Sequence, residues 1–192
     1  MAQATETRAT VDDLYQVEGK AELIGGRIVR FMGTGVRPAY VASEIFVSLR
    51  LYSKARGKGL AMTDGVAFVV PELASGRESF SPDASYYEGS TPATSMKFAQ
   101  GPPTLAVEVR SEGDYGPAAE RAMAAKRADY FEAGTAVVWD VDPVAGLVHV
   151  FRGPSAVPDA TYGRGQIAEA EPAVPGWNVA VDEVLGVQGA EG

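Results

Sequence analysis

One acidic residue interrupts the most apolar strand-like segment of the sequence. Glu108 stands in the middle of the run LAVEV at 105–109, in which every other side chain is apolar. Burying an ionised carboxylate is expensive unless the group is paired with a cation or bound to a metal ion. A fold that buries this strand must therefore bring a positive charge to residue 108.

Two other side chains are candidates to complete this charge arrangement. Lys126 lies in a predicted helix, with Met123 three residues before it and Tyr130 four residues after it. Side chains at these spacings share one face of a helix, so the ammonium lies beside an apolar stripe that points toward a sheet. Asp83 stands inside a second strand-like segment, and it supplies a carboxylate besides that of Glu108.

Two carboxylates and one lysine are a sensible set for phosphate hydrolysis. Mg²⁺ prefers oxygen ligands, keeps several waters and is typically held by one or two carboxylates together with substrate phosphate. The metal lowers the pKa of a bound water and stabilises charge on the phosphoryl group, while a lysine positions that water or neutralises the developing charge. The spacing fits a second interpretation equally well, namely a buried structural ion pair between Glu108 and Lys126.

The order of helical and strand-like segments predicts an α/β fold with a mixed sheet flanked by helices. A short helix capped by Thr10 comes first, followed by a hairpin over 21–31 with the turn Gly25-Gly26. We then expect a helix over 38–55, strands over 60–70, 79–88 and 104–110, a helix over 117–133, and strands over 135–141 and 147–153. Residues 153–192 are a turn-rich extension with a short final element around 181–185.

Composition narrows the range of functions. The length of 192 residues predicts a single domain over 1–192. The absence of cysteine and the single histidine, His149, exclude disulfides, a thiolate nucleophile and a multi-histidine metal site. No apolar run approaches the roughly 20 residues of a membrane span, and the start MAQATETRAT has no apolar signal core, so we expect a cytoplasmic protein. The net charge of −8 is opposite to that of a general nucleic-acid binder, so a nucleic-acid function needs a local basic patch or a bound cation.

Four short motifs in a fixed order resemble a known family. They are ELIGGRIV at 22–29, PDASYY at 82–87, PPTLAVEVRSEGD at 102–114, and K-x3-Y-x2-AG at 126–134 followed by VVWDVDP at 137–143. With these motifs the sequence resembles the Uma-two family, which is placed in the PD-(D/E)xK restriction-endonuclease-like superfamily. The resemblance covers roughly residues 10–152. It implies a core of helix, three strands, helix and strand, the same order that the periodicity predicts.

The resemblance also implies roles for individual residues. Asp83 would be the aspartate of the PD half, and with Glu108 it would bind Mg²⁺ or Mn²⁺. Arg110 occupies the position where the superfamily usually has its lysine, so Lys126 becomes the catalytic candidate. Arg110 remains protonated and is suited to contact phosphate. Glu22 matches a recurrent glutamate of the family, and we expect it to add a ligand or to hold Lys126.

The function implied is a Mg²⁺-dependent endonuclease that hydrolyses DNA phosphodiester bonds, and nucleases of this fold often act as homodimers. The family pattern includes a histidine near the start of the helix after the hairpin, and residues 33–41 contain none; Arg37 and Tyr40 are the nearest polar candidates. This departure, together with Arg110 and the net charge, favours an alternative: a catalytically weak or inactive domain of the same fold that binds a protein or nucleic-acid partner.

Overall fold

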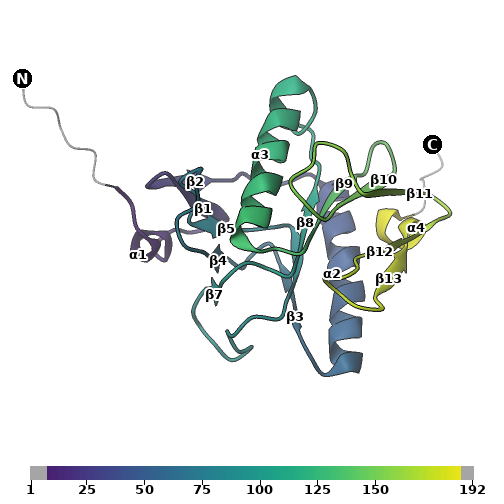
Figure 1. Cartoon of the computed structure of the whole chain (residues 1–192), viewed down its shortest axis with the longest axis horizontal. Coiled ribbons are helices and arrows are strands. Elements are labelled where there is room, and N and C mark those ends of the chain that lie inside the picture. The colour runs from purple at the N-terminus through teal and green to yellow at the C-terminus, as the bar shows by residue number, and fades with distance from the viewer. Residues whose placement is uncertain (1–7, 187–192) are drawn as a thin grey trace, which may run out of the picture.

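A six-stranded mixed sheet forms the centre of the computed structural model, which describes residues 8–186 (Figure 1). The strand order is β11-β10-β9-β8-β6-β3, with β8 and β9 parallel and the other neighbours antiparallel. The strands of this sheet are β3 (Leu60–Thr63), β6 (Ala84–Tyr87), β8 (Leu105–Val109), β9 (Val137–Asp142), β10 (Leu147–Phe151) and β11 (Ala160–Gly163). Because β8 and β9 are central and parallel, they require a crossover, and α3 (Pro117–Ala133) supplies it.

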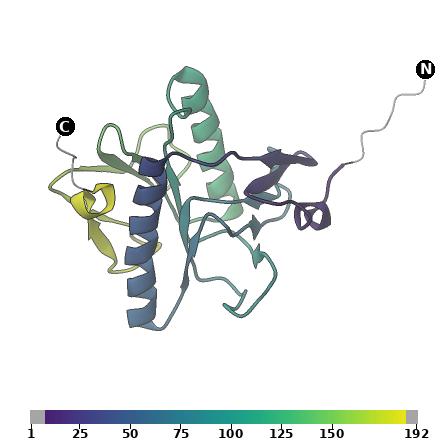
Figure 2. The same ribbon diagram turned by 180° about the vertical axis from the view of Figure 1, so that it is seen from behind.

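The two long helices cover opposite faces of the sheet. Figure 1 shows α3 in front of the sheet, and Figure 2 shows α2 (Val36–Arg56) in front of the other face. Alternation along β8 separates the two cores: Leu105, Val107 and Val109 pack on the α2 side, whereas Ala106 packs with Tyr130 on the α3 side. The side chain of Glu108 therefore belongs to the face that α3 covers.

Smaller elements flank this core. A hairpin of β1 (Ala21–Ile24) and β2 (Arg27–Arg30) follows α1 (Val11–Leu14) and lies beside α3 (Figure 1). A three-stranded sheet contains β4 (Phe68–Val69), β5 (Ser79–Phe80) and β7 (Ala99–Gln100). The remaining elements, β12 (Ile167–Glu169), β13 (Asn178–Ala180) and α4 (Val181–Leu185), contribute to the core on the α2 side. There Trp177 packs against Trp139, with ring centroids 5.0 Å apart.

The predicted fold class is confirmed, because the structure is a mixed sheet flanked by helices with an N-terminal helix and hairpin. Local sequence signals predicted the ends of several helices. Helix α3 begins at Pro117 and ends before Gly134, whose φ of 103° suits glycine. The capping box of Thr10 and Asp13 is also present, with both of its hydrogen bonds formed.

Two predicted strands are wrong in extent, because each divides between two sheets. The segment 60–70 forms β3 and β4, separated by a turn at Asp64 and Gly65. The segment 79–88 forms β5 and β6, separated at Pro82, which has no N–H to continue a ladder. Residues 153–192 were expected to be mostly turns, but β11 extends the main sheet there and β12 pairs with β13. Short strands of three or four residues are too brief to show a clear period in sequence.

Candidate active site

The buried acid of strand β8 has the cationic partner that its position requires. Lys126 on α3 places its Nζ 2.8 Å from Oε1 of Glu108. Tyr130, one helical turn further on, donates its hydroxyl to the same oxygen at 2.6 Å. The i, i+4 spacing on α3 thus directs both groups toward one carboxylate. Each of the two charged side chains remains about a fifth exposed, 19% in both cases, so the pair can be reached from outside.

Asp83 lies immediately before β6, on the strand that pairs with β8. Its Oδ2 accepts a hydrogen bond from the backbone N–H of Val109 at 2.8 Å, and its own N–H donates to the carbonyl of Val107 at 3.0 Å. These bonds hold the Asp83 carboxylate beside the strand that carries Glu108. Its other oxygen, Oδ1, lies 2.6 Å from Nζ of Lys20.

Glu22 on β1 connects the hairpin to this cluster. The residue is fully buried, and its Oε1 accepts from the N–H of Ser81 at 3.0 Å and lies 3.1 Å from Nζ of Lys126. Its Oε2 accepts from the guanidinium of Arg77, which also donates Nε to Asp129 on α3 at 2.8 Å. A fully buried carboxylate is therefore compensated by two cations.

Arg110 follows β8 on the same face, but its guanidinium is already engaged. It donates Nε and Nη2 to the two oxygens of Asp140, at 2.7 and 2.9 Å, and it also contacts Glu120. Asp140 lies opposite Glu108 in the β8–β9 register and pairs with Arg127 as well, at 3.0 Å. Contact of Arg110 with phosphate thus remains a prediction, and it requires exchange of its more exposed partner, Glu120, whose side chain is 47% exposed.

One cavity of about 640 Å³ joins these residues. Its lining includes all five of the residues singled out in the sequence, Glu22, Asp83, Glu108, Arg110 and Lys126. They come from the hairpin, the β6 strand end, β8 and α3, which are far apart along the chain. The structure therefore brings the predicted set together at one place.

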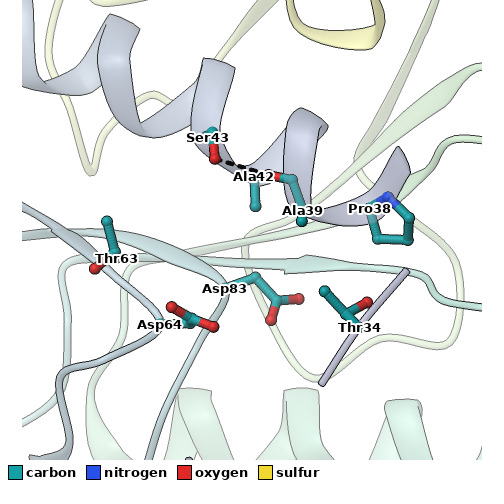
Figure 3. A pocket seen from close by; sticks show the side chains of 8 residues that line it. All are labelled: Thr34, Pro38, Ala39, Ala42, Ser43, Thr63, Asp64 and Asp83. Carbon is teal, nitrogen blue, oxygen red and sulfur yellow. Dashed lines mark hydrogen bonds between the residues drawn. The ribbon is translucent and has the colours of Figure 1, made fainter. Parts of the chain in front are cut away.

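A smaller cavity of about 130 Å³ adjoins Asp83 on the side of α2 (Figure 3). Figure 3 shows the carboxylates of Asp64 and Asp83 pointing into the same space. The first turns of α2 present Pro38 and Ala39 to this cavity, rather than Arg37 or Tyr40. The two polar residues nearest the expected histidine position, Arg37 and Tyr40, are thus not among the residues that line this cavity.

The charges of the site are strongly coupled. Burial raises the pKa of Glu108 above its ordinary value, and the neighbouring Asp83 and Glu22 raise it too, against the opposing pull of Lys126. Burial also tends to raise the pKa of Glu22, but Lys126 and Arg77 lower this pKa below its ordinary value. Burial alone would lower the pKa of Lys126, yet Glu108 and Glu22 raise it above the ordinary value of a lysine. The ammonium is thus protonated at neutral pH.

The donor set fits a divalent cation of the Mg²⁺ type. Asp83 and Glu108 offer oxygen ligands and line one cavity, and the Asp83 charge raises the pKa of Glu108, an effect that a bound cation would oppose. Within residues 8–186 no three acidic or histidine side chains gather closely enough to hold a metal ion by themselves. A metal here would therefore complete its shell with water and substrate phosphate, as Mg²⁺ commonly does.

Several residues of the site were missed by sequence reasoning. Lys20, Arg77 and Tyr130 bind the three carboxylates, and Asp140 holds Arg110. Two of these residues carried a usable signal: Tyr130 shares the helix face of Lys126, and Asp140 is an acid within an apolar strand, as Glu108 is. Lys20 and Arg77 lie in short polar stretches whose sequence does not distinguish them from solvent-exposed residues.

Comparison with known proteins agrees with this description. The family model Uma2, described as "Putative restriction endonuclease", matches residues 10–182. The match thus extends beyond residue 152 and takes in the C-terminal strands. No curated protein matches the sequence. Among solved structures, a "putative nuclease belonging to DUF820" from Anabaena variabilis is similar, with a TM-score of 0.64 and 15% sequence identity. The similarity covers 92% of this chain and 97% of that one, and it concerns the fold.

Among the residues that the structure describes, no helix is long and apolar enough to cross a membrane.

Proposed function

Because the chain belongs to the Uma2 family of restriction-endonuclease-like proteins, we propose that it is a Mg²⁺-dependent endonuclease that hydrolyses DNA phosphodiester bonds. The observation that carries the proposal is the meeting of Asp83, Glu108 and Lys126 at one cavity, with the Lys126 ammonium 2.8 Å from the Glu108 carboxylate. A DNA substrate also agrees with the cytoplasmic location expected from the sequence.

The residues have distinct tasks in this reaction. Asp83 and Glu108 would hold Mg²⁺ or Mn²⁺, which supplies a water of lowered pKa and a positive charge at the phosphate. In the hydrolysis a water oxygen would bond to phosphorus as the bond from phosphorus to the leaving oxygen breaks, the proton of the water would pass to solvent, and the leaving oxygen would take up a proton from solvent. With two carboxylates within 3.1 Å, Lys126 keeps its proton, so it orients the water or neutralises the phosphate charge rather than accepting a proton. Glu22 holds Lys126 in place and accepts from Arg77.

Cleavage is expected to depend on a divalent metal and on Asp83. Asp83→Asn keeps the size and the hydrogen bond from Val109 but removes the negative charge that would bind the metal. We expect the variant to lose cleavage of supercoiled plasmid in Mg²⁺ or Mn²⁺ by at least about 100-fold. Calorimetric titration with Mn²⁺ should show metal binding to the wild type and its loss in the variant.

The matched control is Asp159→Asn, a change at an exposed loop acid away from the cavity, which should leave cleavage unchanged. Cleavage that persists at wild-type rate in Asp83→Asn would remove this residue from the mechanism. Metal binding without any cleavage of DNA by the wild type would favour the non-catalytic binding domain instead.

The outer face of α2 supports a homodimer. Val36, Tyr40, Val47 and Leu51 are 46–90% exposed, and their spacings of four, seven and four residues form one stripe on the helix. The stripe is symmetric about its centre, so antiparallel contact of two α2 helices would pair Val36 with Leu51 and Tyr40 with Val47. A two-fold dimer uses such a self-complementary surface. Light scattering is expected to give twice the chain mass of 20.1 kDa, and a mass equal to one chain would exclude the dimer.

A further inference from the structure

An apolar lip at the mouth of the cavity is not explained by the packing of the protein. Val29, Phe31 and Met32, at the end of β2 and just beyond it, line the same cavity as Glu108 and Lys126. They are 38%, 40% and 93% exposed, respectively. Their neighbour Ile28 packs into the small core beneath the hairpin, so the alternation of the strand turns Val29 and Phe31 the other way.

The ring of Phe31 is placed by the charged residues of the site. Its centroid lies 6.0 Å from Nζ of Lys20 and 5.7 Å from Nζ of Lys126. A cation at this distance from an aromatic face attracts the ring, so the two ammoniums help to orient it. The backbone N–H of Phe31 donates to the carbonyl of Lys20 at 3.0 Å, which ties Phe31 to the residue that supplies one of these cations, just before β1.

Phosphate and nucleobase would reach this mouth together. In a nucleotide one sugar separates the phosphate from the base. The ammoniums of Lys20 and Lys126, which would attract the phosphate, lie a similar distance from the Phe31 ring. A cavity of about 640 Å³ is large enough for a nucleotide, not only for a phosphate. The apolar lip therefore lies where the base adjoining the phosphate would be.

We propose that Phe31, assisted by Met32, is a stacking platform for an unpaired nucleobase next to the phosphate that the site binds. This inference rests on the proposed nuclease function and deepens it, because it names the substrate class as single-stranded DNA or duplex with unpaired bases. Bases within a regular duplex have both faces covered by their neighbours, so an aromatic ring contacts a base face only after unstacking. Stacking also suits a chain of net charge −8, because its strength does not depend on a broad basic surface.

The test compares two labelled oligomers of equal length and charge: oligothymidylate and an abasic oligomer with the same phosphates. Affinities are measured by fluorescence anisotropy in Ca²⁺, with a gel to verify that the DNA stays intact. The wild type is expected to bind oligothymidylate about 10-fold more tightly than the abasic oligomer. Phe31→Ala should abolish this preference, and Phe31→Trp should restore it. Met96→Ala, at an exposed apolar side chain that does not line the cavity, is the control that should keep the preference.

The outcomes separate this inference from the proposed function. Equal affinity of the wild type for the two oligomers, no binding of either, or a preference that survives in Phe31→Ala would each overturn the stacking site. If Asp83→Asn abolishes cleavage while no base preference exists, the nuclease stands and the platform does not. If the preference depends on Phe31 while cleavage is independent of Asp83, the platform stands and the proposed catalytic site does not.

Discussion

Replacing Lys126 with methionine is expected to abolish DNA cleavage and to lower the free energy of unfolding. The Lys126 ammonium lies 2.8 Å from Glu108 and 3.1 Å from the fully buried Glu22. Methionine fills a similar volume but leaves these carboxylates without that cation, and breaking a buried pair in this way costs about 3–5 kcal/mol. Loss of a positive charge at the reacting phosphate lowers the rate by about 100- to 1,000-fold. Urea denaturation and plasmid cleavage measure the two effects.

A double variant distinguishes catalysis from a purely structural ion pair. In Lys126→Met/Glu108→Leu both partners of this pair are apolar and Glu22 keeps Arg77 as its cation, so the part of the lost stability that comes from leaving Glu108 unpaired should return. If the pair acted only in stability, cleavage would return together with the free energy of unfolding. We expect the stability to recover and the cleavage to stay absent. Recovery of cleavage in the double variant would assign Glu108 and Lys126 to the architecture of the sheet alone.

Replacing Arg77 with leucine is expected to be among the most destabilising changes in the protein. The Arg77 guanidinium joins Glu22 of the hairpin to Asp129 of α3, with a distance of 2.8 Å to Asp129, and it lies over the ring of Phe80. All three charged side chains are close to fully buried, so removing the arginine leaves two acids without their shared cation. We expect the free energy of unfolding to fall by about 3–5 kcal/mol in urea denaturation.

Arg8 provides the matched control for this change. It pairs with Glu72 and Glu78, as Arg77 pairs with two acids, but its side chain is half exposed, and exposed pairs add little to stability. Arg8→Leu should therefore leave the denaturation midpoint nearly unchanged. Equal midpoints for Arg77→Leu and the wild type would show that the hairpin is held to α3 by packing and not by this ion pair.

Much of the fold could be predicted because its signals are local. Helix α3 has proline at its first position and glycine after its last, and the capping box of α1 lies within four residues. The hairpin turn needs positive φ at two successive residues, and Gly25-Gly26 provides it at 58° and 70°. The division of the segments 60–70 and 79–88 between two sheets was not predictable, because it depends on which distant strand each half pairs with.

The candidate site could be predicted in part, for a related reason. An acidic residue in an apolar strand can be recognised in the sequence, because its buried carboxylate requires a neighbouring positive charge. This rule identifies Glu108, and it applies equally to Asp140. The cations that neutralise these carboxylates have no comparable sequence signal. Lys20 and Arg77 look like surface residues in the sequence, and only the tertiary structure brings Lys20 to Asp83 and buries Arg77 between Glu22 and Asp129.

The sequence by itself therefore determined the class of fold, the limits of the main helices and the need for a positive charge beside residue 108. These features follow from backbone preferences and from the cost of burying charge, which act over a few residues. Only the tertiary structure decided which cation meets which acid. It also decided that the ammoniums of Lys20 and Lys126 lie over the ring of Phe31. Such contacts join segments up to about a hundred residues apart, and their geometry depends on how whole elements pack.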